Sequence, residues 1–584
     1  MKRCLSGSIA ARQKKDRQLK KRALLLLSAA LSVTGLSQTY AADVTTSFTV
    51  LSPADVKTYR DIFAAENSGQ EGKSEALVKK LSDTSLVGYV LEERYLGTHY
   101  HSKFSELKDW LENYGDLPGA DKIYKLAVKR APKKTSVPPP VRAHWRGIDN
   151  EPSAFEDTNP EHQAVRRLET ELKSMARENR PEAAETLWKR ASVQTRLTEA
   201  DFDRLGAFVA TAYLGEQKDR QALSLCADVI AKNGTNALQC HWVAGLASYR
   251  LADFAAAAGH FETIVNNSRV PRTYSSAAFW AARSHMHGGE PDRVLTLYER
   301  AASEPDTFYG LMALRVLGRD MNAQFAEPAL DTVSFAQLMQ DQPAHRAVAM
   351  WQIGRTDMVE TEMSRAFGDI SSDQDPAFAA LARNLGEPSL ELRAAEMAQP
   401  AQRLTSLYPV PPYKPEGGYT VDQAVILAFA KQESRFQPAA ISKAGARGVM
   451  QIMPQTAVTI THDRSLAGHN KDRLDDPVYN MTLAQNYLRD LLDRQNGNLF
   501  SIAAAYNAGE GNLSKWQSQQ DANSDPMLFI ETIPLAETRD YIKRVMTNLW
   551  MYRLRLGEPV TGLDDAASGA WPIYKSAAGE TAAH

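Results

Sequence analysis

The chain has 584 residues, which is too long for one hydrophobic core, so several domains are expected. Its hydrophobic content of 43%, charged content of 24% and formal net charge of −2 are ordinary for a soluble globular protein. No apolar run reaches the roughly 20 residues that a membrane-spanning helix needs, which argues against such a helix.

Residues 1–42 have the pattern of an export signal. Basic residues gather between Lys2 and Arg22, an apolar segment follows at 23–36, and small residues begin at Ala41. This order is typical of a signal peptide, so we predict cleavage and a periplasmic location, with an uncleaved membrane anchor as the alternative. Without this leader the chain is about ten charges negative. It shows no basic footprint, so we expect no nucleic-acid partner.

The segment 43–400 reads as one helix after another, because apolar residues recur at spacings of three and four. Small and aromatic residues recur within 242–261 and again within 278–298, a pattern that resembles tetratricopeptide-type helix pairs. Such pairs stack into a superhelix. A proline-rich segment at 131–152 reads as a connector within this region.

A second segment rich in proline and glycine, at 401–420, is the sharpest break in the chain and is expected to be a linker. It separates the superhelical region from a predicted catalytic domain at 421–556. The tail at 557–584 is rich in Ala, Gly and Ser, and we expect it to be disordered.

Two cysteines follow the leader, Cys226 and Cys240, on predicted helices that flank an Asn-Gly turn. An exported hairpin of this kind permits a disulfide. Two buried thiols are the alternative, and the sequence does not decide between them.

Glu433 stands at the end of an apolar helical run that begins near Val421. A carboxyl group held against an apolar wall has its charged form disfavoured and its pKa raised. It can then keep a proton at neutral pH and give it to a leaving oxygen in glycoside cleavage. A glutamate near a helix end is usually a solvated surface charge, so the sequence around Glu433 decides its interpretation.

The residues after Glu433 offer groups suited to a sugar. Ser442 and Gln451 carry a hydroxyl and an amide, and Met450 and Met453 offer apolar, adaptable surface. The glycines between them permit tight turns and a close approach of backbone to ligand. Each residue also has an ordinary structural explanation, because glycines make turns and methionines fill cores.

Tyr506 and Asn507 follow a run of small residues later in the chain. The hydroxyl of Tyr506 could lie on Glu433 or on the sugar. The alternative is a core tyrosine whose hydroxyl is satisfied by the protein.

A third cluster begins at Glu531. Either Glu531 or Glu537 could line a sugar groove. The competing explanation is a structural ion pair with Arg539 or Arg544.

Taken in order, these motifs resemble the catalytic domain of the soluble lytic murein transglycosylases, which is related to goose-type lysozyme. The matching positions are Glu433-Ser434, Phe436-x-Pro438, Ser442, a Gly-Ala turn, Gly448-x-Met450-Gln451-x-Met453-Pro454, Tyr506-Asn507-Ala508-Gly509 and Ile533-Pro534-x-x-Glu537-Thr538-Arg539. Val449 replaces a more usual leucine. The preceding helical region, including residues 307–310, is similar more loosely to the superhelical domain of the same family.

The resemblance implies an all-α fold, with a ring-like helical-repeat superhelix followed by a mainly α lysozyme-like catalytic domain. It implies the catalytic residue Glu433 and the substrate-binding residues Ser442, Gln451, Met453, Tyr506, Asn507 and Glu537. No metal or organic cofactor is implied, since the twelve histidines are scattered without ligand spacing.

The implied activity is that of a peptidoglycan lytic exotransglycosylase acting on the bond between N-acetylmuramic acid and N-acetylglucosamine, with 1,6-anhydro ends as product. The sequence itself does not distinguish cleavage at chain ends from cleavage within strands. The implied partners are peptidoglycan glycan strands; other cell-wall enzymes and a peripheral association with the outer membrane are further options.

Two other functions stay open. One is a hydrolase with goose-type lysozyme chemistry, in which water replaces the sugar hydroxyl as nucleophile. The other is a helical-repeat scaffold that only binds glycan, against which the intact Glu433 argues.

Overall fold

The computed structural model describes residues 48–144, 146, 163–178, 180–194, 197–321, 323–327, 330–519 and 525–577. Within these ranges the regular secondary structure is helical, and the β pairing consists of isolated bridges, so the predicted all-α class is confirmed. None of the described helices combines the length and the apolar character needed to cross a bilayer. The predicted signal peptide at 1–42 lies outside the described residues.

The chain forms two compact units, each built from segments that are distant in the sequence. The first unit comprises Met1–Arg146 and Pro328–Ala394, and the second comprises Gly147–Glu327 and Ala395–His584. The predicted domain boundaries at 43–400, 401–420 and 421–556 are not tested by this division and stay a prediction, as does the ring-like closure of the superhelix.

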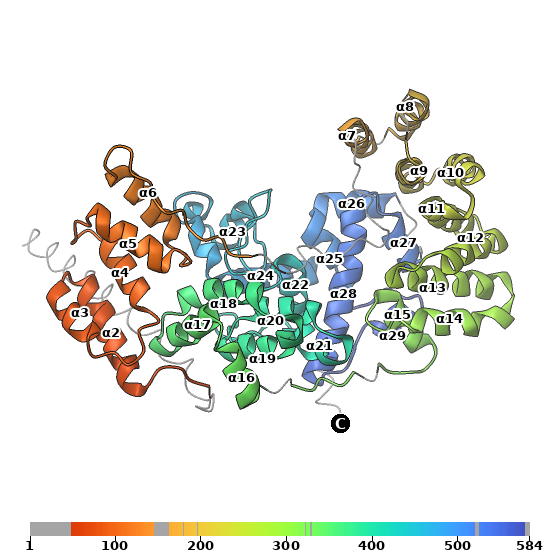
Figure 1. Ribbon diagram of the computed structural model, residues 1–584. Helices are drawn as coiled ribbons and strands as arrows, with labels where there is room; N and C mark the ends of the chain where they lie inside the picture. The colour runs from red at the N-terminus through yellow and green to blue at the C-terminus, as the bar shows by residue number, and fades with distance from the viewer. Residues whose placement is uncertain are drawn as a thin grey trace, which may run out of the picture. The chain divides into compact units, whose positions relative to one another are not determined.

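The first unit contains short helices from both ends of its sequence range (Figure 1). Its helices are α2 (Pro53–Asn67), α3 (Glu71–Val78), α4 (Val87–Leu96), α5 (Phe104–Tyr114), α6 (Ala120–Arg130), α16 (Thr332–Leu338), α17 (Gln342–Ile353), η3 (Thr356–Met358), α18 (Val359–Asp369), η4 (Ser372–Gln374), α19 (Asp375–Leu385) and α20 (Pro388–Met397), the last of which leads into the second unit. Glu362 is fully buried among them and accepts hydrogen bonds from Tyr89 and Arg346, so polar contacts join α4, α17 and α18.

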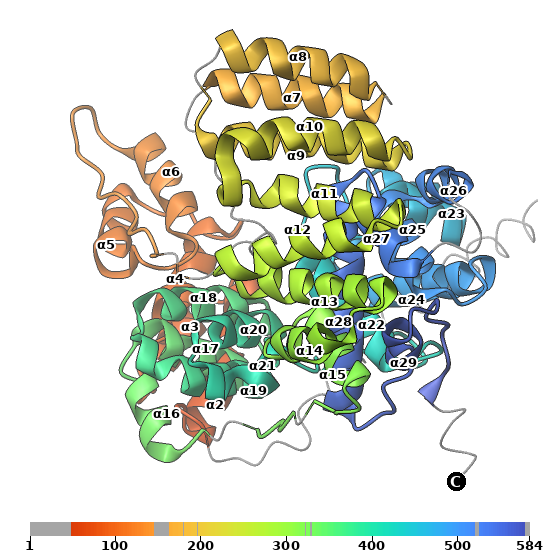
Figure 2. The same ribbon diagram turned by 90° about the vertical axis from the view of Figure 1, so that its right-hand side faces the viewer.

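The first half of the second unit is a stack of antiparallel helix pairs, which Figure 2 shows as successive layers. Its helices are α7 (Gln163–Arg177), α8 (Pro181–Gln194), α9 (Glu199–Gly215), α10 (Asp219–Asn233), η1 (Gly234–Asn236), α11 (Leu238–Arg250), α12 (Phe254–Asn267), α13 (Pro271–Gly288), η2 (Pro291–Arg293), α14 (Val294–Ala302) and α15 (Phe308–Val316).

The repeat pattern read from the sequence corresponds to packing between these pairs. The ring of Phe261 lies 5.4 Å from that of Trp242 and 5.8 Å from that of Trp280, so one aromatic joins α11, α12 and α13. A side-chain carbon at Gly245 would meet the Phe261 ring at 2.7 Å. The small residue therefore sets how closely α11 and α12 approach, as helical repeats require.

Cys226 of α10 and Cys240 of α11 are both buried, and both are free thiols in the structure. Of the two alternatives left open by the sequence, the structure shows the buried thiols.

The second half of this unit holds the predicted catalytic region. Its helices are α21 (Pro400–Leu407), α22 (Gln423–Ser434), α23 (Pro454–Thr461), η5 (Arg464–Ala467), η6 (Lys471–Asp475), α24 (Pro477–Arg494), α25 (Leu499–Ala508), α26 (Glu510–Ser518), α27 (Pro526–Thr532), α28 (Ala536–Leu556) and α29 (Leu563–Ala567). The long helix α28 packs along α22 and α25.

Buried contacts fix the helix stack to this region. Phe308 of α15 stacks on Trp550 of α28 at 5.4 Å between ring centroids. The hydroxyl of Tyr309 donates to the buried Glu531 of α27 at 2.6 Å and accepts from Trp280 at 3.0 Å. Because these groups are buried and hydrogen-bonded, α15 holds α27 and α28 in place.

The prediction of a disordered tail from residue 557 is wrong for residues 557–577. Trp571 packs on Phe500 and Phe529, with ring centroids 6.2 and 5.3 Å away. The fully buried Arg553 donates to the carbonyl oxygens of Pro559 and Lys575. Composition alone suggested disorder, but one aromatic anchor and satisfied backbone groups hold this segment. The remaining tail residues lie outside the described ranges.

Candidate active site

Glu433 lies on the last turn of α22, a helix whose interior is almost entirely buried. The helix ends at Ser434, and the next two residues, Arg435 and Phe436, adopt positive φ angles, 57° and 64°. Such angles are uncommon for residues other than glycine, so the chain is held sharply at this point. The hydroxyl of Ser434 donates to the carbonyl of Val449 at 2.7 Å, which ties the helix end to the following loop.

The carboxyl of Glu433 accepts a hydrogen bond from the hydroxyl of Tyr541, at 2.5 Å. Burial raises the pKa of Glu433 to about 8; the Tyr541 hydrogen bond opposes this rise, and the nearby charge of Glu537 adds to it. The residue as a whole is half-buried. The predicted protonated carboxyl against an apolar wall is therefore present at neutral pH.

Two tyrosines lie close to this carboxyl, and they have different partners. The hydroxyl of Tyr506 donates to the carbonyl of Met450 at 2.8 Å, not to Glu433. Burial, followed by the charge of Glu433, raises the pKa of both Tyr506 and Tyr541. Phe429 contacts both rings, with centroids 4.9 and 6.3 Å away. Glu433 is thus not the partner of Tyr506; the structure shows the alternative, a hydroxyl satisfied by the protein, and a contact with the sugar stays a proposal.

Side chains of the loop after α22 form hydrogen bonds with the backbone of the same loop. Ser442 accepts from the amide of Ala446 through its hydroxyl, at 3.0 Å. Gln451 donates through its side-chain amide to the carbonyls of Ala440 and Gly448, at 3.0 and 2.9 Å, which leaves its amide oxygen as the group to offer a ligand. Both predicted sugar-binding residues therefore also shape the loop.

The side chain of Asn480, on α24, holds this loop through hydrogen bonds to its backbone. Its side-chain oxygen accepts from the amide of Met450 at 2.8 Å, and its nitrogen donates to the carbonyls of Arg447 and Leu474. Gly448 has a φ of 81°, and a side-chain carbon there would meet the Leu474 carbonyl at 2.2 Å. The glycine is required by both conformation and space.

The other predicted site residues fall into two groups. Asn507 of α25 accepts from the hydroxyl of Thr538 at 2.7 Å, while Glu537 and Met453 are exposed. Glu531 is buried and accepts from Lys543 at 2.9 Å, so the competing ion-pair explanation holds for it, although with a lysine in place of the expected arginines.

The sequence interpretation did not assign roles to Tyr541 and Asn480. Tyr541 stands four residues after Glu537 on α28, one helical turn along the same face. That spacing was a usable signal once Glu537 was placed in the groove. Asn480 belongs to no local sequence motif, and only the fold brings its side chain into contact with the backbone of Met450.

No group of three or more His, Cys, Asp or Glu side chains suited to a metal occurs among the described residues.

Known proteins resemble the part of the chain that carries this site. Residues 412–529 match the Transglycosylase SLT domain family. The soluble lytic murein transglycosylase of Escherichia coli K12 is 35% identical over 145 residues, which are 25% of this chain and 22% of that protein. Its counterpart from Salmonella typhimurium is 33% identical over 150 residues, or 26% of this chain and 23% of the relative. The chain thus matches these relatives over less than a quarter of their own length.

Solved structures extend the likeness at the level of fold. The 70 kDa soluble lytic transglycosylase of Escherichia coli has 16% identity and a TM-score of 0.55, and the likeness covers 89% of this chain and 99% of that one. The complex of the 70-kDa soluble lytic transglycosylase with bulgecin A gives 17% identity and a TM-score of 0.61 over the same shares. The lytic transglycosylase Slt of Pseudomonas aeruginosa gives 19% and 0.54, over 87% of this chain and 74% of that one. Residues 412–529 are therefore a transglycosylase SLT domain, in a chain that shares the fold of these soluble lytic transglycosylases.

Proposed function

We propose that this protein is a lytic transglycosylase that cleaves the β-1,4 bond between N-acetylmuramic acid and N-acetylglucosamine in peptidoglycan and leaves 1,6-anhydro ends. The observation that carries the proposal is the protonated carboxyl of Glu433, held by Tyr541 in a transglycosylase SLT domain. Relatives of this chain are named soluble lytic murein transglycosylases, and the family match at residues 412–529 includes Glu433.

In this mechanism Glu433 first gives its proton to the glycosidic oxygen, so the bond to the anomeric carbon breaks as the N-acetylglucosamine hydroxyl leaves. The ionised carboxylate then takes the proton from the C6 hydroxyl of the muramic sugar. That oxygen closes onto the anomeric carbon of its own ring, which balances the reaction without water. Tyr541 donates to the carboxylate that forms between these steps.

Most glycosidases use two carboxyl groups, one as acid and one as base or nucleophile. Glu537 is the carboxylate whose charge reaches Glu433 in the structure, but it acts by raising the pKa of Glu433. A single acid and base at Glu433 suits a substrate that supplies its own nucleophile, with the sugar's acetamido group assisting.

We assign substrate contacts to Ser442, Gln451, Met453, Tyr506, Asn507 and Glu537. Met453 is exposed and can cover a sugar face, and the amide oxygen of Gln451 can accept from an N-acetyl group. These residues come from the loop after α22, from α25 and from α28, so the three segments would close around one glycan strand.

The test is digestion of purified peptidoglycan followed by mass spectrometry of the released muropeptides. Anhydro ends, lighter by one water than reducing ends, support the proposal. Reducing ends would instead assign lysozyme-like hydrolysis, and no release would favour the glycan-binding scaffold. Glu433→Gln is the matched control, because it keeps the size of the side chain and removes the proton donor.

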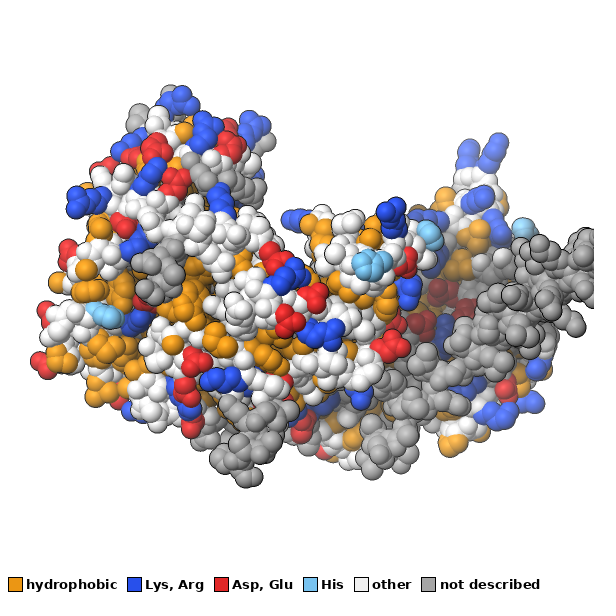
Figure 3. Space-filling view, turned by 180° about the vertical axis from the view of Figure 1, so that it is seen from behind, with side chains coloured by type: hydrophobic (Ala, Val, Ile, Leu, Met, Phe, Trp, Pro, Cys, Tyr) orange, Lys and Arg blue, Asp and Glu red, His pale blue; other side chains and the backbone are white. Residues whose placement is uncertain are grey.

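The cellular setting follows from this substrate and is proposed with it. Periplasmic action for wall remodelling or recycling fits the export signal of the sequence. The face shown in Figure 3 mixes Lys and Arg with Asp and Glu side chains. The absence of a nucleic-acid partner stays an expectation from the sequence. Binding to other wall enzymes or peripheral attachment to the outer membrane stays an expectation.

A further inference from the structure

Four rings form an aromatic cluster beside Glu433: those of Phe429, Tyr487, Tyr506 and Tyr541. Phe429 and Glu433 are four residues apart on α22, so they share one face of this helix. The ring of Phe429 contacts those of Tyr506 and Tyr541. Tyr506 in turn contacts Tyr487 of α24, with ring centroids 5.5 Å apart. Tyr487 therefore extends the wall of rings that begins at the reacting carboxyl.

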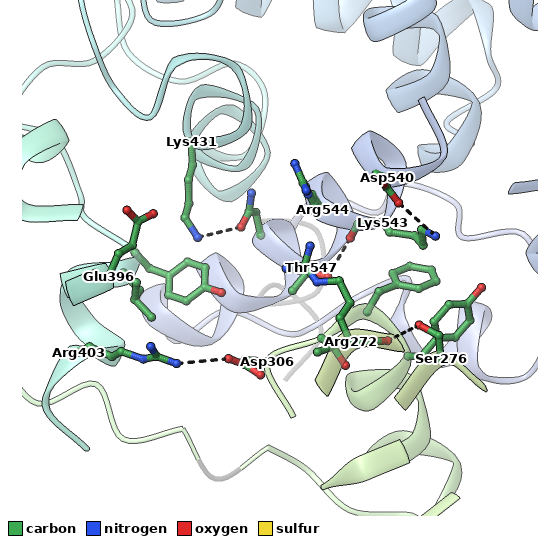
Figure 4. Close-up of a pocket in the computed structure, with 16 residues that line it drawn as sticks. Arg272, Ser276, Asp306, Glu396, Arg403, Lys431, Asp540, Lys543, Arg544 and Thr547 are labelled. Carbon is green, nitrogen blue, oxygen red and sulfur yellow. Dashed lines mark hydrogen bonds and ion pairs between the residues drawn. The ribbon is translucent and has the colours of Figure 1, made fainter. Parts of the chain in front are cut away.

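The opposite face of α22 has a different character. Lys431 and Glu433 are two residues apart, which places their side chains about 200° apart around the helix. Lys431 lines a cavity of about 320 Å³, shown in Figure 4, whose other charged side chains include Asp306 and Arg403, 3.9 Å apart. The aromatic cluster thus lies on the side of α22 that carries the reacting carboxyl, whereas this charged cavity lies on the other side.

The three tyrosines of the aromatic cluster use their hydroxyls differently. That of Tyr541 donates to Glu433, and that of Tyr506 donates to the carbonyl of Met450. The hydroxyl of Tyr487 forms no hydrogen bond with the described part of the chain, although the residue is half-buried. A tyrosine held partly inside a protein usually has a hydrogen-bond partner, so the partner of this hydroxyl has to come from solvent or from a ligand.

The hydroxyl of Tyr487 keeps its proton at neutral pH. Burial raises the pKa of Tyr487, the charge of Glu510 adds to this rise, and the charge of Arg494 opposes it. Arg494 and Glu510 pair with each other at 2.7 Å, so neither of them depends on the tyrosine as a partner. A neutral phenol both donates and accepts hydrogen bonds, which suits the hydroxyl and acetamido groups of a sugar.

Helix α24 connects Tyr487 with the loop after α22. Asn480 and Tyr487 are seven positions apart, so they lie on one face of α24 and about 10 Å apart along it. The side chain of Asn480 accepts from the amide of Met450, and Tyr506 donates to the carbonyl of the same residue. Because the ring of Tyr506 also contacts Tyr487, Tyr506 spans the distance between the loop and Tyr487.

We propose that Tyr487 is a further substrate-binding residue, whose hydroxyl forms a hydrogen bond with a hydroxyl or acetamido group of an N-acetyl sugar in the bound glycan strand. This inference rests on the proposed function, because it takes the glycan as the ligand of the site beside Glu433. It adds α24 to the segments that contact substrate. Tyr487 binds the strand but transfers no proton, since the hydroxyl bonded to Glu433 is that of Tyr541.

The first test measures binding without cleavage. Isothermal titration calorimetry compares the Glu433→Gln protein with the double variant Glu433→Gln, Tyr487→Phe as each binds a β-1,4-linked tetramer of N-acetylglucosamine. Phenylalanine keeps the ring that packs on Tyr506, so the variant should fold, and the unfolding temperature checks this. We expect the loss of one hydrogen bond to weaken binding by about three- to tenfold.

The second test uses the kinetics of cleavage of peptidoglycan. Tyr487→Phe alone should raise KM by a similar factor and leave kcat within about twofold, because the lost contact is made in the ground state and the transition state alike. The alkaline limb of the pH profile should stay in place, since Tyr487 does not hold the carboxyl of Glu433. A merely structural role would instead lower the unfolding temperature and kcat.

Tyr479→Phe is the matched control on the same helix. Tyr479 is also half-buried on α24, and its hydroxyl also forms no hydrogen bond with the residues that the structure describes. The guanidinium of Arg473 lies over its ring, 4.4 Å from the centroid, and the ring is not part of the aromatic cluster. We expect this variant to bind the tetramer as tightly as its parent.

Unchanged affinity and KM in Tyr487→Phe would overturn the inference, as would an equal loss in Tyr479→Phe or no binding of the tetramer by the Glu433→Gln protein. The proposed function fails in a different way. A wild-type protein that releases no anhydro ends, while binding of the tetramer still depends on Tyr487, contradicts the cleavage chemistry alone. Anhydro products together with an unchanged KM in Tyr487→Phe contradict this inference alone.

Discussion

The hydroxyl of Tyr541 donates to the carboxyl of Glu433 across 108 positions of sequence. This bond opposes the effect of burial on the pKa of Glu433, which nevertheless stands at about 8. The same contact orients the carboxyl and moderates its affinity for the proton. Both effects can be separated by experiment.

Tyr541→Phe is expected to raise the pKa of Glu433 further, because a hydrogen bond to the charged form is lost. Activity on peptidoglycan should fall by roughly tenfold through loss of orientation, which is a part of the roughly 10²–10⁴-fold that a positioned acid contributes as a whole. The measurement is the pH dependence of the rate, whose alkaline limb should move to higher pH. Tyr506→Phe is the control: it removes a bond to the Met450 carbonyl and should leave that limb in place.

Glu537→Gln should move the alkaline limb in the opposite direction. The charge of Glu537 raises the pKa of Glu433, so removing that charge lowers the pKa and the rate declines at lower pH. Glu537 is exposed, and the variant should fold normally. An unchanged pH profile with a raised KM would show that Glu537 only contacts substrate.

The raised pKa of Glu433 also predicts how stability depends on pH. The folded-state pKa of about 8 lies above the ordinary value of 4.5, so the folded protein binds the proton more tightly than the unfolded chain does. The corresponding stabilisation is complete below about 4.5 and is lost as pH rises through about 8. Thermal unfolding should therefore show Glu433→Gln gaining stability relative to the wild type across this window, and a pH-independent difference would contradict the assignment.

Gly448→Ala and Gly445→Ala form a matched pair in the loop after α22. Both glycines have positive φ, 81° and 90°, but only a side-chain carbon at 448 meets other atoms, while none lies within 4 Å at 445. We expect about 1 kcal/mol of destabilisation at 445 from backbone conformation alone, and more at 448. Urea unfolding measures both, and KM should rise for Gly448→Ala because Gln451 is displaced. Equal effects would show that the close contact is unimportant.

Tyr309→Phe tests the buried contact between the helix stack and α27. It removes a donor from the buried Glu531 and an acceptor from Trp280, and such losses cost about 1–3 kcal/mol each. Tyr213→Phe is the control, because its partner Glu185 is partly exposed and water can replace the hydroxyl. The thermal unfolding temperature should fall clearly for Tyr309→Phe and little for Tyr213→Phe.

The parts of the site that were predictable from sequence are the local ones. An apolar helix ending in Glu433 and a glycine-rich loop after it are short-range patterns, and both are present. Tyr541 and Asn480 were not found because their roles depend on contacts between distant helices. The Met450 carbonyl was not predicted as the partner of Tyr506 for the same reason, because the sequence does not reveal which backbone group a distant helix will meet.

For the fold as well, short-range patterns were predictable from the sequence and long-range contacts were not. Helix pairs were visible through periodicity and through residues such as Gly245 and Phe261. The tail was mispredicted because composition counts many small residues and gives little weight to a single Trp571.

The anchored tail decides which fragment of this protein can be studied alone. Asp422, at the start of α22, accepts from Arg553, Ser576 and Ala577, so the first turn of the helix that carries Glu433 is fastened by the last described residues. A fragment trimmed to the family match at 412–529 would lose Tyr541 and the hydrogen bonds that Asp422 accepts. An expression fragment of the catalytic region therefore has to extend through residue 577, and an affinity tag belongs beyond that point.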